Sequence, residues 1–445
     1  MNLYFAGLDA VMQPSVLLML VIGVLAGTII GVLPGLSATM GVAVLTPLTF
    51  GRDAVSSLAL LLGCYCAAAW GGSITATMAR IPGTPAAIMT TMDGYPLGQQ
   101  GKAGLAIGVA TVSSFFGGLF SVFILAIFAG PIANYALNFG APEYFSLAVF
   151  GLSVIVFISS KNMIKGLLSA CIGLLISSIG LDPMSGFQRY TFNSFDMISG
   201  IELLPVMIGI FGLSEVMNVV SKKTFEIKVI KQISRVWVSK KEFRQIMPSI
   251  ARGSVLGTFI GAVPAAGGSI AAIMSYGLEK AVAKKPEQFG HGALEGIAGP
   301  ESANNASTGG AMIPLLTLGI PGDAITAVLI GSLMLHGISP GPMLFRNNIE
   351  LVSAIYILMF LANILFLAVG LVGARTASKL ISTPVKYFIP VVALLCCVGT
   401  YALRNSVFDL FVLLALGIIG FLFSKIDVPT SPLILGVVLD SVDTR

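Results

Sequence analysis

The chain has 445 residues, of which 56% are hydrophobic and only 10% are charged, and its formal net charge is +5. An ordinary soluble domain carries about 25% charged residues, so this composition, with a mean hydropathy of +0.94, excludes a water-soluble globular protein. It predicts an all-α polytopic membrane protein, because a helix of roughly 20 apolar residues spans a bilayer.

Apolar stretches that could cross or half-cross a bilayer follow one another along the whole chain. In order, we expect them near residues 15–50 (broken), 55–79, 103–130, 143–159, 163–180, 199–220, 253–277 (broken), 307–336 (with a break near Ile320), 350–373, 385–402, 406–424 and 430–439. The last of these is too short to span a bilayer, so the chain is expected to stop inside an element.

Glycine- and proline-rich interruptions recur in the same order in the two halves of the chain. The first half has breaks at 31–37, 71–73 and 81–84, and the second has them at 261–269, 309–310 and 320–323, offset by 230 to 239 positions. Broken apolar segments at matching places are typical of the binding site of a secondary transporter. Backbone outside a helix survives at membrane depth only where it is buried in protein or lines a cavity. We therefore predict two inverted repeats, residues 1–220 and 253–445.

Residues 221–252 separate the two repeats and differ from the rest of the chain in charge. They hold nine of the 25 lysines and arginines, against two glutamates. An excess of Lys and Arg in a short loop marks the cytoplasmic side of a membrane. We therefore predict a basic cytoplasmic linker; a nucleic-acid or lipid-headgroup patch is the alternative, and we expect no nucleic-acid partner.

The broken segment 253–277 is also followed by basic residues, namely Lys280, Lys284 and Lys285. A single crossing would place them on the opposite side from the linker. Because 253–260 and 269–277 are each too short to span, we favour a re-entrant hairpin with its tip at 264–268; the alternative is one helix kinked at Pro264. Segment 18–50 would be its partner, entering from the periplasmic side.

The breaks are the candidate site for an anion. A helix that restarts after a break presents free N–H groups and the positive end of its dipole, which bind anions without a charged side chain. Ser37 and Thr39 can cap the half-helix after the first break, and Ser269 can cap the one after the second. The alternative for each glycine is close helix packing. The predicted substrate-binding residues are Pro34, Gly35, Ser37, Thr39, Gly71, Gly72, Ser73, Thr75, Arg80, Gly267, Gly268 and Ser269.

Arg80 and Thr84 stand at the end of the first-half motif. A charge at the bilayer centre costs about 2.5–3.5 kcal/mol, so Arg80 either pairs with a substrate carboxylate or reaches the membrane interface. Thr84 precedes Pro85, which predicts a helix cap with proline at the first helical position. Asp323 is the matching cap in the second half.

The strongest polar constellation lies between residues 299 and 310. If this segment is helical, Glu301, Asn304, Asn305 and Thr308 share one face. Their oxygens suit a hard cation such as Na⁺, and the carboxylate could instead carry a proton. Together with Asp323 they are the predicted coupling-ion or substrate residues, no other cofactor being expected. The alternative is a solvated helix start with Glu301 in its first turn.

Several strings resemble the large membrane subunit of the bacterial tripartite tricarboxylate transporters. They are Gly31-Val-Leu-Pro-Gly-Leu-Ser, Gly71-Gly-Ser-Ile-Thr-Ala-Thr, Ile81-Pro-Gly-Thr-Pro, Asp93-Gly-Tyr-Pro-Leu, Leu318-Gly-Ile-Pro-Gly-Asp and the long string from Gly290 to Asn305. The resemblance implies import of tricarboxylates or related organic anions, driven by a cation gradient across the bacterial inner membrane. It also implies two partners, a small four-helix membrane subunit and a periplasmic substrate-binding protein, and an elevator-like arrangement by analogy.

Two other functions remain open at this point. A membrane-embedded enzyme acting on a lipid-like substrate would need clustered acids, histidines or a metal motif, and the chain has two histidines and scattered acids. A passive anion channel needs no pair of broken repeats, although it could have them. Members of the resembling family usually continue past the position of Arg445, so a C-terminal truncation is expected.

Overall fold

The chain folds almost entirely into helices, as its composition predicts. The computed structural model describes residues 5–140, 142–143, 145–147, 149–151, 153, 162–182, 185–221, 229–230, 233–264, 266–381, 383 and 387–443. Most of the predicted segment 143–159 lies outside these residues. Within them, six helical stretches are long and apolar enough to cross a membrane: Pro14–Val32, Ala54–Ala79, Thr90–Ala136, Leu203–Ser221, Ile349–Ala374 and Val407–Lys425.

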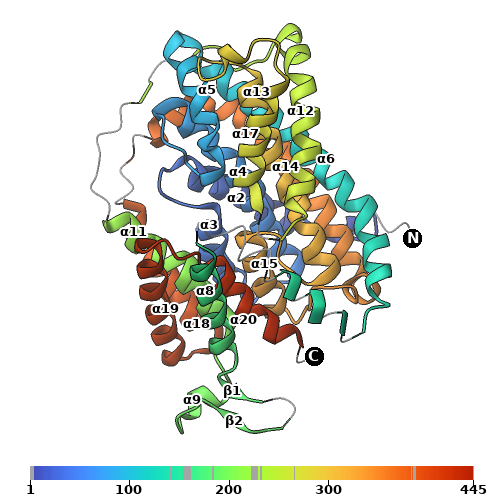
Figure 1. Ribbon diagram of the computed structural model, residues 1–445, viewed down its shortest axis with the longest axis vertical. Coiled ribbons are helices and arrows are strands. Elements are labelled where there is room, and N and C mark those ends of the chain that lie inside the picture. Colours follow the sequence, from blue (N-terminus) through green and yellow to red (C-terminus); the bar gives the residue numbers. More distant parts are fainter. Residues whose placement is uncertain are drawn as a thin grey trace.

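The first half contains two long helices and several interrupted ones. A two-stranded antiparallel sheet, β1 (Gly180–Leu181) with β2 (Gln188–Arg189), projects from one end of the molecule (Figure 1). The helices are α1 (Leu8–Val11), α2 (Pro14–Val32), α3 (Ala38–Leu45) with η1 (Thr46–Thr49), α4 (Ala54–Ala79), η2 (Pro85–Ile88), α5 (Thr90–Leu97) with η3 (Gly98–Lys102), α6 (Ala103–Ala136), α8 (Met163–Ser177), α9 (Phe195–Ile198), α10 (Leu203–Met207) with η4 (Ile208–Leu213), and α11 (Ser214–Ser221).

The second half is likewise helical, and its predicted break near Ile320 is confirmed. One helix ends at Leu318 and the next begins at Ala324. The helices are α12 (Lys240–Gly261), α13 (Gly267–Val282), η5 (Pro286–Gln288), α14 (Glu295–Leu318), α15 (Ala324–Leu335), α16 (Leu344–Asn347), α17 (Ile349–Ile381), α18 (Phe388–Arg404), α19 (Val407–Lys425) and α20 (Ser431–Asp443).

The helices form two groups that meet near the middle of the molecule (Figure 1). The larger group packs α2, α4, α5, α6, α12, α13, α14 and α17 against one another, and the smaller group contains α8, α11, α18, α19, α20 and η4. The short helices α3 and α15 contact members of both groups. Both short helices begin directly after a break, so the breaks lie where the two groups meet.

A helical hairpin is present at the predicted place, residues 253–277, and its re-entrant position in the membrane stays a prediction. Helix α12 ends at Gly261, α13 begins at Gly267, and both pack on α14. Ser249 and Arg252 of α12 bond to Glu279 of α13, twelve residues beyond its first residue, so the two helices run antiparallel and the single kinked helix is excluded.

Two details of the hairpin prediction are wrong. Helix α12 starts at Lys240, well before residue 253, and α13 continues to Val282, so neither arm is as short as the apolar pattern suggests. The amphipathic residues 240–252, with the Ser239–Glu242 capping box in front, extend the helix through the basic segment. Residues 240–252 of the expected linker are thus the first turns of α12.

In each half, a long helix is followed by a short loop and then by a new helix. The residue directly after α4, Arg80, is in the left-handed conformation, and so is Gly319, the residue directly after α14. An Ile-Pro-Gly turn follows in both cases and leads to a new helical start, at Thr84 or at Asp323. The sequence repeat is therefore a repeat of local structure; the inverted relation of the halves and the elevator-like arrangement stay predictions.

A buried carboxylate fastens the start of α14 to α5. Asp93 of α5 is fully buried, and its Oδ1 accepts bonds from the backbone N–H groups of Gly290 (2.9 Å), Gly292 (2.9 Å) and Ala293 (2.8 Å). Its Oδ2 accepts from the Tyr276 hydroxyl at 2.9 Å. Both glycines have positive φ, which turns successive N–H groups towards one acceptor.

Candidate functional site

The broken segments of both halves line one cavity of about 230 Å³. Its walls come from α3, α4, α13, α14, α15, α20 and the turn before η2, which meet near the centre of Figure 1. Among the predicted residues, Ser37, Thr39, Gly267, Gly268, Ser269, Asn304, Thr308 and Asp323 line it. The cavity is therefore the place where the two halves bring their breaks together.

Four helices present their N-termini to this cavity. Helix α3 begins after Ser37, whose Oγ accepts from the Met40 N–H at 3.1 Å, and this confirms the predicted cap. Helix α15 begins after Asp323, whose cap is also confirmed. Helices α13 and α20 begin at Gly267 and Ser431, both in the wall. The positive ends of four helix dipoles thus face one space.

The start of α13 is tightly packed. Gly267 has a φ of +61°, a conformation that favours glycine. A Cβ on Gly268 would lie 2.4 Å from Asn304 Oδ1 and 3.0 Å from Ser307 Oγ, so this backbone touches α14 directly. Ser269 lies inside the first turn and is not the cap that the sequence suggested, because the helix begins two residues earlier.

The cavity wall contains an acid but no base. Among the described residues that line it, there is no lysine, arginine or histidine, and the ionisable side chains are Tyr65 and Asp323. The Tyr65 hydroxyl donates to Asp323 Oδ2 at 2.7 Å. Any anion held here would be bound by backbone N–H groups, hydroxyls and amides.

One hydroxyl in the wall is left without a partner. Thr84 is 4% exposed, and its Oγ1 is buried with no hydrogen-bond partner. A buried, unpaired hydroxyl is costly, and such groups are usually satisfied by a water molecule or a ligand. The Oγ1 also lies 2.5 Å from the position of a Cβ on Gly72, so Gly72 allows the turn to approach α4.

The polar face of α14 is helical, as predicted, but its members do different things. Asn304 and Asn305 donate to the carbonyls of Ala69 (2.8 Å) and Cys66 (3.2 Å) on α4. Asn304 and Thr308 line the cavity, whereas Asn305 and Glu301 do not. The two amide side chains therefore link α14 to α4 by donating to backbone carbonyls of α4.

Glu301 lies inside the protein. It is 1% exposed and accepts bonds from the hydroxyls of Thr90 and Ser114, the latter at 3.1 Å. It is the seventh residue of α14, so the alternative of a solvated helix start is wrong. No ion pair to Glu301 is present among the described residues.

Other predicted residues of the first half lie outside the cavity wall, at the turn after α2 or in the contact between α2 and α4. Pro34 and Gly35 form the turn between α2 and α3. Gly71 is packed against Gly31 of α2, and Thr75 Oγ1 donates to the Val32 carbonyl, so these two hold the end of α2 against α4. Ser73 is fully buried and its hydroxyl has no partner. None of the five lines the cavity.

Arg80 lies outside the cavity. Its side chain is exposed, and its guanidinium carbon lies 5.9 Å from the centre of the Tyr95 ring. Of the two interpretations left open by the sequence, the geometry favours the arginine that reaches outward rather than the one that pairs with a substrate.

Replacing Arg80 by glutamine is therefore expected to have a small effect. The change removes an exposed cation–π contact, worth about 0.5–1 kcal/mol, and leaves the cavity wall intact. Uptake of labelled substrate by membrane vesicles should stay within about threefold of wild type. A complete loss of uptake in a correctly inserted Arg80→Gln protein would show instead that a side-chain cation holds the substrate.

Sequence reasoning missed four polar residues of the wall: Tyr65, Thr84, Ser307 and Ser431. Thr84 was predicted as a cap and not as a site residue; it does precede η2 with Pro85 at the first position, but its hydroxyl makes no capping hydrogen bond, so the side-chain cap is wrong. Ser307 follows Asn304 by three positions, which places both on one side of a helix and could have indicated it. Ser431 stands between Thr430 and Pro432 before an apolar run, a helix-start pattern that could have indicated it. Tyr65 stands in an apolar stretch, and no local pattern marks it.

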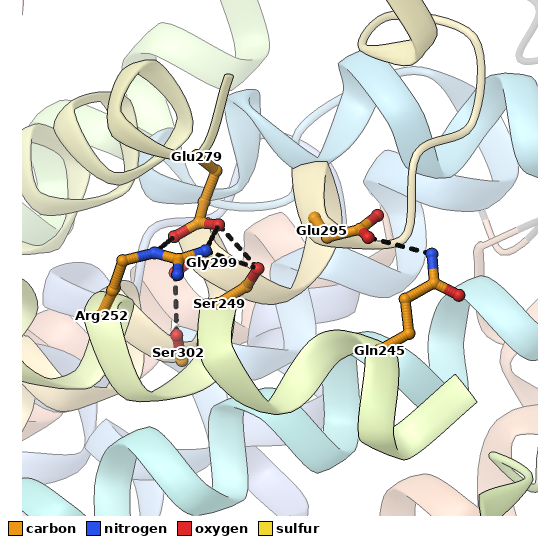
Figure 2. A network of polar contacts seen from close by, with 7 residues as sticks. All are labelled: Gln245, Ser249, Arg252, Glu279, Glu295, Gly299 and Ser302. Atoms are coloured by element: carbon orange, nitrogen blue, oxygen red, sulfur yellow. Dashed lines mark hydrogen bonds and ion pairs between the residues drawn. The ribbon is translucent and has the colours of Figure 1, made fainter. Parts of the chain in front are cut away.

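A polar network holds the base of the hairpin, far from its tip. Figure 2 shows Arg252 and Ser249 of α12 pointing at Glu279 of α13, and Gln245 pointing at Glu295 of α14. Arg252 donates to Glu279 through Nε at 2.9 Å, and Ser249 donates to it at 2.6 Å. Glu279 is 1% exposed whereas the Arg252 side chain is 39% exposed, so the ion pair links the two arms at the edge of the protein.

An apolar multi-pass fold with broken helices around a polar cavity defines a membrane transport protein. The chain belongs to the tripartite tricarboxylate transporter TctA family, whose model matches residues 17–435. It is thus a tricarboxylate transporter subunit and not an enzyme. Membership of this family excludes the alternative of a membrane-embedded enzyme that acts on a lipid-like substrate.

Two proteins of Agrobacterium vitis are similar to the chain. An "uncharacterized 52.8 kDa protein in TAR-I ttuC' 3'region" is 37% identical over 433 residues, covering 97% of this chain and 86% of the relative. An "uncharacterized protein in TAR-II ttuC' 3'region" is 37% identical over 183 residues, covering 41% of this chain and 76% of the relative. No solved structure matches the chain.

Proposed function

We propose that this chain is the transport subunit of a binding-protein-dependent secondary transporter that imports tricarboxylates or related organic anions, driven by a cation gradient. The observation that carries the proposal is the cavity, in which four helix N-termini meet and whose described wall residues include no lysine or arginine. Helix N-termini bind carboxylates by backbone N–H groups and dipole, and they avoid the insertion cost of several basic side chains.

The partners follow from the family. A tripartite system implies further components beside this subunit, and we propose a small four-helix membrane subunit and a periplasmic substrate-binding protein. The location would be the bacterial inner membrane, with the basic residues between 221 and 252 on the cytoplasmic side. The binding protein would deliver the anion to the cavity, and the membrane subunit would carry it across.

We assign coupling to buried oxygen groups around α14, and above all to Glu301. An ionised carboxylate buried without a cationic partner is strongly unfavourable, so Glu301 would bind either the coupling H⁺ or a coupling Na⁺. Thr90 and Ser114 offer hydroxyl oxygens beside it. Asn305 adds an amide oxygen that is buried and has no partner, one turn further along the same helix.

Replacing Glu301 by glutamine should separate binding from coupling. Glutamine keeps the shape and an oxygen for Thr90 or Ser114, but it neither titrates nor holds a cation strongly. We expect gradient-driven accumulation of substrate to fall at least about tenfold, whereas substrate binding to the purified protein stays near wild type. Full accumulation by Glu301→Gln would remove this residue from the coupling site.

The proposed function is tested by reconstitution. The chain, its small membrane partner and the binding protein are placed in proteoliposomes, and accumulation of labelled citrate is followed with an imposed Na⁺ or H⁺ gradient. We expect accumulation only with the binding protein and with one of the two gradients. Equilibration without accumulation, independent of both, would show a passive anion channel instead.

A further inference from the structure

The cavity contains a negative side chain where an anion is proposed to bind. Asp323 lies in the wall between Tyr65 and the first turn of α15. A substrate carboxylate placed against it would be repelled, and no lysine or arginine of the described wall offsets its charge. The part of the substrate that faces Asp323 must therefore be a hydrogen-bond donor or a cation.

The two oxygens of Asp323 have different partners. Oδ1 accepts from the Thr326 backbone N–H at 2.7 Å, and the single proton of the Thr326 hydroxyl is directed either to Oδ1 at 2.8 Å or to the Asp323 backbone carbonyl at 2.9 Å. Oδ2 accepts from the Tyr65 hydroxyl at 2.7 Å. A carboxylate oxygen can accept about two hydrogen bonds. Oδ2 can therefore accept one more, and Asp323 lies in the cavity wall.

The surroundings favour a hydroxyl over a metal cation at this position. The N-termini of α3, α13 and α15 border the same cavity, and their dipoles attract anions and repel cations. Tyr65 supplies a neutral donor on the other side of Oδ2. A substrate hydroxyl completes this arrangement and leaves the substrate carboxylates to the helix ends.

We propose that the cavity selects hydroxylated carboxylates, and that Asp323 is the residue that reads the substrate hydroxyl by accepting its hydrogen bond at Oδ2. The inference rests on the proposed function and names the substrate class of that same site. A site built to bond a substrate hydroxyl rejects the analogue that lacks it, because its own buried polar group is then left unpaired. A cavity of about 230 Å³, the volume of roughly seven or eight waters at ~30 Å³ each, suits a small organic acid.

The test compares acids that differ only in a hydroxyl. The purified full-length chain in lipid nanodiscs is titrated calorimetrically with malate and succinate, and with citrate and tricarballylate. We expect the hydroxylated member of each pair to bind at least about tenfold more tightly. Equal affinities within the pairs would overturn the proposal but leave the proposed function standing, since both acids would still bind.

The variant that isolates the effect is Asp323→Asn. Asparagine is as good a helix cap as aspartate, so α15 should still form, and thermal unfolding checks this. Removing the charge should reduce the preference to within about threefold, chiefly because the acids without a hydroxyl bind better. Asp427→Asn, which removes an exposed acid far along the chain, is the matched control and should keep the wild-type ratio.

Two further results bear on the proposal. Tyr65→Phe removes the fixed donor to Oδ2 but not the charge, so affinities should fall while the preference for the hydroxyl persists. If Asp323→Asn keeps the hydroxyl preference and instead changes the Na⁺ concentration needed for binding, Asp323 is a cation ligand and the proposal is wrong. If no acid binds to any of the proteins and reconstitution moves none, the proposed function fails as well.

Discussion

Replacing Gly268 by valine is expected to reduce uptake by about 100-fold or more. The Cβ of any larger residue would lie 2.4 Å from Asn304 Oδ1, so either the start of α13 or the Asn304 amide must move. Both border the cavity, and a displacement of about 1 Å at a binding site can cost 10²-fold in rate. Uptake of labelled citrate by the reconstituted transporter measures the effect.

Gly277 provides a matched control within the same helix. It lies nine residues after Gly268 in α13, and a Cβ there would meet no atom within 4 Å. Gly277→Val should therefore transport normally, even though it places the same residue type in the same helix. Equal uptake by the two valine variants would show that the start of α13 tolerates displacement and is not part of the site.

Replacing Asp93 by alanine is expected to destabilise the protein by at least about 3 kcal/mol. The change leaves three backbone N–H groups and the Tyr276 hydroxyl without their acceptor. The Ala293 N–H is buried and the other three donors are part-buried, and an unsatisfied buried donor costs about 1–3 kcal/mol. Thermal unfolding of the protein in detergent should show a clearly lower Tm.

Two milder variants test the cause of that loss. Asp93→Asn keeps a carbonyl oxygen for the three N–H groups, so it should lose less than half of the stability that Asp93→Ala loses. Tyr276→Phe removes one hydrogen bond only and should cost about 1 kcal/mol. If Asp93→Ala is no less stable than Tyr276→Phe, contacts other than those of Asp93 hold the loop between η5 and α14.

The sequence allowed the helical class, the broken segments and eight of the nineteen residues of the cavity wall to be predicted. The breaks at 31–37, 261–269 and 320–323 were visible because glycine and proline interrupt apolar runs. Ser37 and Asp323 could be recognised as caps because a short polar residue stands directly before an apolar helical run. These are local signals, and local chemistry decides them.

Residues whose role depends on distant packing could not be predicted in the same way. Gly71 and Gly72 belong to the repeated motif, but they serve close approach to Gly31 and Thr84 rather than contact with the cavity. Tyr65 reaches the site only because α4 passes beside the start of α15, 258 residues later. The length of α12 was underestimated because hydropathy ends at its basic turns, whereas the capping box and the helix do not.

The fastening of Asp93 has a mechanical consequence for how the cavity can open. Asp93 lies five residues after the end of η2, and it joins α5 to the residues that enter α14. The Thr84 turn and the polar face of α14 are thereby linked to one another. The Tyr276 hydroxyl of α13 donates to the same Asp93 carboxylate, so the α12–α13 hairpin is linked to these elements as well. We therefore expect rearrangement of the cavity on its opposite side, where α3 and α15 meet α20 and the rest of the smaller group of helices.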